Sequence, residues 1–212
     1  MLLPVGAAVL CLGVCLPLFK YYQKSLRPVL GALYKTLGTC CALVVALVAA
    51  LRLDSFCFLC VAALAIHAAA DYTLEFSFPL GAGLFMAGHI CYIAFFMHYF
   101  PLSGAQILCL IGFLTFTGLM LYRWRKAAGK QLLLFAVYGV VLCSISACVI
   151  GGGILSHTSQ GIMAAGAGAL LFLSDSLLCY RLLYPTGRIM GWSIMVTYYL
   201  AELLFATSCL LI

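Results

Sequence analysis

Apolar residues run along this chain in long blocks that short polar links interrupt. The hydrocarbon core of a bilayer is about 30 Å thick, so a helix needs about 20 mostly apolar residues to cross it. The blocks predict eight membrane-spanning helices, over residues 2–19, 29–51, 55–76, 79–98, 103–121, 131–150, 160–183 and 188–211. The first block lacks the basic start and clear small-residue cleavage site of a signal peptide, so we interpret it as a span. The links are short, and we expect a single transmembrane domain over residues 1–212.

The composition favours a membrane protein over a soluble one. Hydrophobic residues make up 67% of the 212 residues, and charged residues only 8%. A soluble domain cannot bury so much apolar surface. The blocks are also too long and too uniform for the alternating strands of a β-barrel. The sequence therefore predicts an all-α integral membrane bundle of about eight helices. The twelve cysteines lie mostly inside the apolar blocks, where we interpret them as small core residues.

The basic residues gather in alternate links, so the net charge of +6 indicates membrane orientation and not nucleic acid binding. Nine of them lie in or beside the links after the first, fifth and seventh spans: Lys20, Lys24, Arg27, Arg123, Arg125, Lys126, Lys130, Arg181 and Arg188. The opposite side has Arg52. Because basic links stay in the cytosol, the pattern predicts a multi-pass protein of the cell membrane with both termini outside.

A carboxylate within the seventh predicted span is the least expected residue of the chain. Asp175 lies between Ser174 and Ser176 in an otherwise apolar segment. A charged side chain at the centre of a spanning helix costs about 2.5–3.5 kcal/mol on insertion scales, so Asp175 should face the protein interior. Small residues precede it at four-residue spacing and should let a neighbouring helix approach closely. They are Gly161, Ala165 and Ala169, with Ala164 and Gly168.

Four other polar residues fall at a similar depth. At 1.5 Å per residue, Lys35, Asp71, His89, Tyr198 and Asp175 lie roughly 8–15 Å from the cytosolic ends of five spans. We therefore expect one buried polar layer in the cytosolic half. Each residue also has a simpler interpretation. Asp71 can be a helix-end acid, Lys35 can extend to the cytosolic surface, and His89 can be a core histidine.

The remaining polar residues leave similar alternatives. Tyr198 and Tyr199 can be core or interfacial aromatics. Glu202 lies deeper, where a structural hydrogen bond is favoured. His67 and Glu75 share a helix face with Asp71 and can tune it or be solvated.

Two buried carboxylates, Asp71 and Asp175, favour acid–base chemistry, because one of a pair can be protonated while the other is ionised. Metal catalysis is disfavoured: the four histidines form no HExxH motif and no i, i+4 pair. Ser174 and Ser176 lack the G-x-S-x-G context of a serine nucleophile. We expect no metal and no cofactor.

Several blocks make the chain resemble the lysoplasmalogenase, or YhhN-like, family of membrane proteins. Ala70-Asp71-Tyr-Thr-Leu is similar to the G-D-x-x-L of the family, and His89-Ile-Cys-Tyr92 to its H-x-x-Y. The segment from Ala167 to Asp175 is similar to its G-A-x-x-F-x-x-S-D, and Thr197-Tyr198-Tyr199-Leu-Ala-Glu202 to its T-Y-Y-x-A-Q. Tyr34-Lys35-Thr36-Leu37 is similar to its K-P-L segment. Ala70, Thr36 and Glu202 depart from the usual glycine, proline and glutamine, which leaves both acids in place.

The resemblance implies an enzyme that hydrolyses the vinyl ether of lysoplasmalogens, releasing an aldehyde and a glycerophospho-alcohol. It implies Asp71 and Asp175 as the catalytic pair and does not say which is the acid. Lys35, His89, Ser174, Tyr198 and Tyr199 would then bind or orient the lysophospholipid or water. Two alternatives stay open: a proton-coupled small transporter, and a non-catalytic membrane protein that binds lipid.

Overall fold

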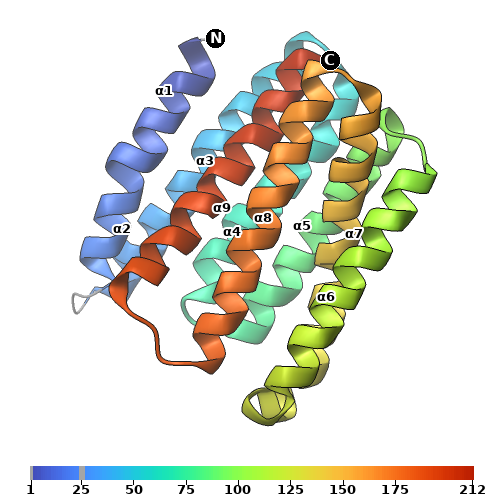
Figure 1. Cartoon of the computed structure of the whole chain (residues 1–212). Helices are drawn as coiled ribbons and strands as arrows, with labels where there is room; N and C mark the ends of the chain where they lie inside the picture. Colours follow the sequence, from blue (N-terminus) through green and yellow to red (C-terminus); the bar gives the residue numbers. More distant parts are fainter. Residues whose placement is uncertain (1, 24–26) are drawn as a thin grey trace.

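The computed structural model describes residues 2–23 and 27–212, which form helices and no strand (Figure 1). The helices are α1 (Leu2–Leu10), α2 (Leu16–Tyr22), α3 (Pro28–Arg52), α4 (Phe58–Leu74), α5 (Phe78–Tyr99), α6 (Gly104–Ala128), α7 (Leu132–Ser156), α8 (Ser159–Leu183) and α9 (Arg188–Ser208). A π-helical turn, η1 (Cys11–Cys15), joins α1 to α2. Three 3₁₀ turns are η2 (Ser55–Cys57), η3 (Gly129–Gln131) and η4 (Cys209–Leu211). Lys24 lies outside the described residues.

The predicted all-α membrane bundle is confirmed. Within the described residues, seven helical stretches are long and apolar enough to cross a membrane. The longest, 53 residues from Gly104 to Ser156, contains α6 and α7, two 25-residue helices that η3 turns back on one another. This hairpin accounts for the eighth span of the prediction.

Two predicted helix ends differ from the structure. Helix α6 continues to Ala128, beyond the expected end at 121, because its basic last turns remain helical after the apolar block has ended. Helix α7 continues through Gly151–Gly153 to Ser156. These glycines do not stop the helix because they let neighbours approach: a Cβ on Gly153 would lie 2.3 Å from the carbonyl oxygen of Gly161 on α8.

The small residues ahead of Asp175 are where α8 meets α7. A Cβ on Gly168 would lie 2.2 Å from Cγ2 of Val149, so a larger residue cannot fit without shifting Val149 on α7. Ala164 is also fully buried. The prediction was wrong for Ala169, which is exposed, so the close contact follows Gly161, Ala164 and Gly168.

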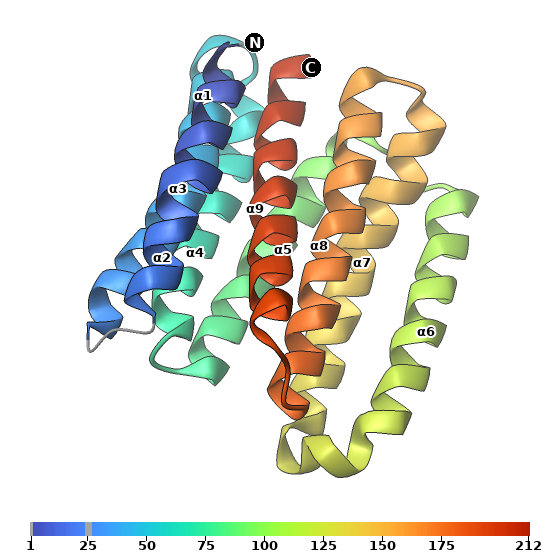
Figure 2. The same ribbon diagram turned by 60° about the vertical axis from the view of Figure 1, so that its left-hand side comes forward.

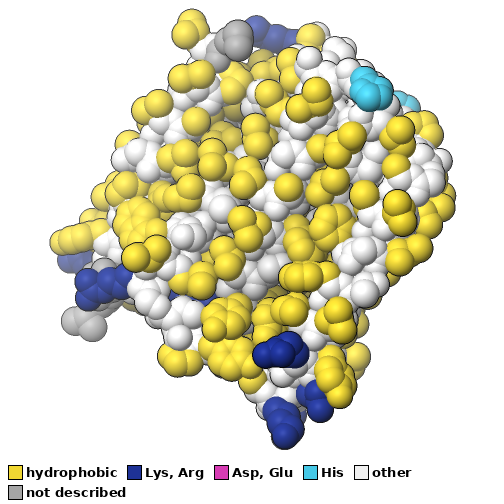
Figure 3. Space-filling model, viewed as in Figure 1, with side chains coloured by type: hydrophobic (Ala, Val, Ile, Leu, Met, Phe, Trp, Pro, Cys, Tyr) yellow, Lys and Arg dark blue, Asp and Glu magenta, His cyan; other side chains and the backbone are white. Residues whose placement is uncertain are grey.

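The links at one end of the bundle carry most of the basic residues, and we call this the basic end. Figure 3 shows Lys and Arg side chains at the lower tip of the molecule, where α6 meets α7, and at its left edge beside α2, with a smaller group at the upper edge. The end of α2, the start of α3 and the turn from α4 to α5 lie at this end too (Figures 1 and 2). Helix α6 stands at the edge of the bundle (Figure 2).

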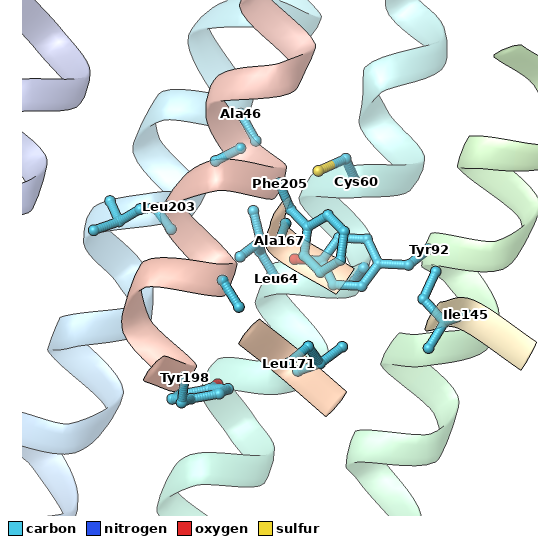
Figure 4. Close-up of a cluster of buried hydrophobic side chains, with 14 of the residues drawn as sticks. Ala46, Cys60, Leu64, Tyr92, Ile145, Ala167, Leu171, Tyr198, Leu203 and Phe205 are labelled. Atoms are coloured by element: carbon cyan, nitrogen blue, oxygen red, sulfur yellow. The ribbon is translucent and has the colours of Figure 1, made fainter. Parts of the chain in front are cut away.

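A hydrophobic core fills the part of the bundle that lies farther from the basic end. Tyr92 and Phe205 pack with ring centroids 4.6 Å apart, and Phe96 lies 5.3 Å from Phe205. Leu64, Ala167 and Leu171 complete the centre of this cluster (Figure 4). Tyr198 lies at its lower edge, where the polar layer begins.

One acid lies outside this interior. Asp54, in the turn between α3 and α4, accepts hydrogen bonds from the hydroxyl of Tyr99 and from the backbone N–H of Phe56. The hydrogen bond from Tyr99, followed by the one from Phe56, holds the pKa of Asp54 below its usual range. Asp54 therefore stays ionised near neutral pH, at the end of the bundle opposite the basic end.

Candidate functional site

Asp71 lies fully buried near the end of α4, among donors from α3 and α9. Thr39 on α3 donates to its Oδ2 at 2.5 Å, and the Tyr198 hydroxyl on α9 donates to the same oxygen at 2.9 Å. The ammonium of Lys35 lies 3.6 Å from Oδ1. Within the described residues, Oδ1 has no hydrogen-bond partner beside this ion pair. The burial of Asp71 excludes a solvated helix-end acid.

Lys35 turns into the bundle and does not extend to the surface. Its ammonium lies 3.0 Å from Oε1 of Glu75, and the residue is only 4% exposed. Glu75 stands one turn after Asp71, with its side chain 21% exposed at the edge of the interior. Lys35 therefore sits between two carboxylates, which offsets the cost of burying its charge.

Asp175 occupies the same layer on α8 and has a different set of partners. The hydroxyl of Tyr138 on α7 donates to its Oδ2 at 2.6 Å. Nε2 of His89 on α5 lies 3.2 Å from that hydroxyl and 3.5 Å from the carboxylate. Asp71 thus has a lysine beside it, whereas Asp175 has a tyrosine and a histidine.

A second buried pair lies one layer deeper. Nδ1 of His67 is 2.8 Å from Oε1 of Glu202, and the Tyr92 hydroxyl donates to Oε2 at 2.6 Å. The ring of His67 packs edge-on against His89, with centroids 4.8 Å apart. Gly88 makes room for it, because a Cβ there would lie 2.2 Å from Cδ2 of His67. Glu202 therefore has the structural hydrogen bonds that its depth predicted.

One cavity of about 50 Å³ joins the two aspartates, and we call it the polar cavity. A cavity needs about 10–15 Å³ to hold one water, so this one has room for water beside a reacting group. Its polar lining comes from five helices: Lys35, Asp71, Tyr138, Ser174, Asp175 and Tyr198. Phe85, Leu178 and Met195 form part of its apolar wall.

The predicted site residues divide into two groups. Lys35, Asp71, Ser174, Asp175 and Tyr198 line the polar cavity, although Ser174 also donates to the backbone oxygen of Ile194. His89 and Tyr199 are not among the lining residues. His89 contacts Asp175 and Tyr138, while the Tyr199 hydroxyl donates to the backbone oxygen of Lys35 at 2.9 Å.

Sequence reasoning missed two residues of the site, Thr39 and Tyr138. Thr39 lies one helical turn beyond Lys35, so the i, i+4 spacing could have pointed to it. Tyr138 lies about seven residues into the sixth predicted span, a depth of roughly 11 Å that matches the polar layer. Within residues 2–23 and 27–212, no group of three His, Cys, Asp or Glu side chains is arranged to hold a metal ion.

The fold and the site define a multi-pass helical membrane protein with two buried aspartates on one internal cavity. The family model of the YhhN family matches residues 30–209, which contain every residue of the polar cavity. The chain therefore belongs to the YhhN family, as the resemblance in its sequence indicated. Searches of curated proteins and of solved structures found no significant match.

Proposed function

We propose that this protein hydrolyses the vinyl ether bond of lysoplasmalogens within the membrane, by acid–base catalysis. The observation that carries the proposal is that two buried carboxylates, Asp71 and Asp175, line one cavity with room for water. Membership of the YhhN family suggests the same reaction. Vinyl ether hydrolysis needs one proton donor and one base on either side of a cationic intermediate, as glycoside hydrolysis does.

The surroundings of the two aspartates favour a division of roles. Asp71 accepts two hydroxyl hydrogen bonds and faces the ammonium of Lys35, which suits an ionised carboxylate. Among the described residues, Asp175 faces a tyrosine and a histidine and no ammonium, so we assign it the role of proton donor. In this proposal Asp71 is the base and Asp175 the acid.

The reaction then balances without any cofactor. Asp175 gives its proton to the second carbon of the vinyl group, and the first carbon and the ether oxygen share the positive charge of an oxocarbenium ion. A water in the polar cavity attacks the first carbon as Asp71 takes one of its protons. The ionised Asp175 then takes the hydroxyl proton of the hemiacetal, and Asp71 gives its proton to the ether oxygen as the bond from carbon to that oxygen breaks. Both carboxyls return to their starting states. The products are an aldehyde and a glycerophospho-alcohol.

The other lining residues would position the lipid. Lys35 can exchange Glu75 for the phosphate of the lipid, because the edge of the site lies towards the basic end. Tyr198 and Ser174 would orient water or the glycerol, and His89 would hold Tyr138 and Asp175 in place.

The test is turnover of a panel of lysolipids by the purified protein, with products identified by mass spectrometry. Lysoplasmalogens should yield aldehyde, whereas saturated alkyl ethers and acyl esters should not react. In deuterated water, aldehyde trapped at once by reduction should carry one deuterium on its second carbon. Absence of aldehyde from every lysoplasmalogen would reject the proposal, and proton-coupled flux in proteoliposomes would then indicate a transporter.

A further inference from the structure

A larger apolar cavity shares Asp175 and Tyr138 with the polar cavity. It has a volume of about 290 Å³ and lies between α6, α7 and α8, and we call it the α6 groove. Its wall on α6 runs from Phe116 to Trp124, and α7 contributes Gly139 and Leu142. Asp175 is the one acid of this lining, and it stands where the two cavities meet.

The groove exists because α6 is held away from α8. Three aromatic pairs join these helices. Phe172 packs against Phe113 at 4.6 Å and Phe116 at 6.1 Å, and Trp124 packs against Tyr180 at 5.9 Å. The lining residues of α6 lie mostly between these pairs. Of the residues of α6, all of which the structure describes, only Gln106 and Ala128, near its two ends, are buried. Ligand sites are concave and mostly apolar, so a groove of this size and lining is a candidate binding site.

We infer that the α6 groove holds the hydrocarbon chain of the lipid substrate. This inference rests on the proposed function and names the part of the molecule that would recognise the chain. The volume is near the lower end of the 300–1,000 Å³ usual for ligand pockets, and the lining is almost entirely apolar. The groove follows α6 over the eight-residue step from Phe116 to Trp124, or about 12 Å.

Asp175 lines both cavities, so it relates the groove to the reaction. In a vinyl ether lipid, the reactive double bond is the first bond of the hydrocarbon chain. A chain lying in the α6 groove therefore places that bond beside Asp175, and the polar cavity supplies water and Asp71. The groove would select lipids with one apolar chain, and its length would set the chain-length preference.

Two neighbouring residues of α6 provide a matched test. Met120 lines the groove, whereas Leu119 does not and is 59% exposed. Met120→Trp should fill the groove and lower kcat/KM for long-chain lysoplasmalogens relative to short-chain ones by about tenfold or more. Leu119→Trp should leave that ratio unchanged. Equal ratios in both variants and the wild type, with both variants folded, would overturn the inference.

A binding measurement separates the groove from the reaction. A saturated alkyl ether lysophospholipid with a diazirine at the end of its chain cannot be hydrolysed by vinyl ether protonation. After photolysis, we expect label on the segments 116–124 of α6 and 135–142 of α7, reduced by Met120→Trp. If the probe labels the groove but the same protein does not hydrolyse lysoplasmalogens, the chain site is supported and the proposed function is rejected. If the protein hydrolyses lysoplasmalogens but the probe labels the whole lipid-facing surface, the groove is rejected as the chain site and the proposed function stands.

Discussion

Tyr198 and Tyr199 are adjacent on α9, yet their hydroxyl groups serve different parts of the protein. Tyr198 donates to Asp71 and lines the polar cavity. Tyr199 donates to the backbone oxygen of Lys35, and its ring fills the space left by Gly38, where a Cβ would lie 2.6 Å from its Cζ. The first contact acts on the proposed base, and the second holds α3 against α9.

These two tyrosines give a residue-scale prediction. A hydrogen bond to a charged group is worth about 1.5–3 kcal/mol, so Tyr198→Phe should lower kcat/KM by about tenfold or more. Tyr199→Phe should instead lower the free energy of unfolding by about 1 kcal/mol and change turnover much less. Kinetics and unfolding in the same detergent measure both. An equal loss of activity in the two variants would contradict the different roles given to Tyr198 and Tyr199.

At the scale of helices, α8 carries Asp175 into the bundle by packing its glycine-rich first half against α7. Gly168 touches Val149 and has no room for a side chain, whereas Gly166 has Leu204 as its nearest neighbour at 3.8 Å from a built Cβ. The two glycines lie two residues apart on the same helix and differ in this contact, so they form a matched pair.

Gly168→Ala should destabilise the protein by about 1–3 kcal/mol, because it overpacks the contact between α7 and α8. Gly166→Ala should be neutral or stabilising by up to about 1 kcal/mol, since alanine favours the helix and its Cβ would make only an ordinary van der Waals contact with Leu204. Thermal unfolding in detergent micelles compares the two variants. Equal stability of both would show that α7 and α8 do not pack closely at Gly168.

The sequence predicted the membrane bundle well, and its site less completely. Hydropathy marks the apolar layer, so eight spans were located to within a few residues, except where α6 and α7 continue beyond that layer. Depth along the helices placed Lys35, Asp71 and Asp175 at one level. The rotation of each helix was not predictable, because a helix that is apolar on most sides has no marked polar face. Tyr138 and Thr39 were missed, and Tyr199 was assigned to the site, for this reason.

At the scale of the whole molecule, the charges of the links predict how the bundle sits in the membrane. The basic end should face the cytosol, with both termini outside. Epitope tags at the C-terminus and within the turn at 129–131 should therefore differ in intact cells. An antibody should reach the C-terminal tag and should reach the turn only after permeabilisation. The reverse pattern would contradict the orientation.

The central claim is that Asp71 and Asp175 act together on one substrate. The matched control is Asp54→Asn, which makes the same chemical change in the loop at the far end of the bundle. Asparagine keeps the shape of each aspartate and removes the titratable proton, and a neutral amide is easier to bury than a carboxylate.

The most direct measurement is lysoplasmalogen turnover by purified Asp71→Asn, Asp175→Asn, the double variant and Asp54→Asn, each confirmed as folded by its unfolding temperature. Each single change in the polar cavity should lower turnover by about 10²–10⁴-fold, the usual contribution of a positioned proton transfer. The turnover of the double variant should be little lower than that of the less active single variant, because the two residues act as a unit. Asp54→Asn should keep wild-type turnover. Near wild-type turnover by folded Asp71→Asn and Asp175→Asn would contradict the account.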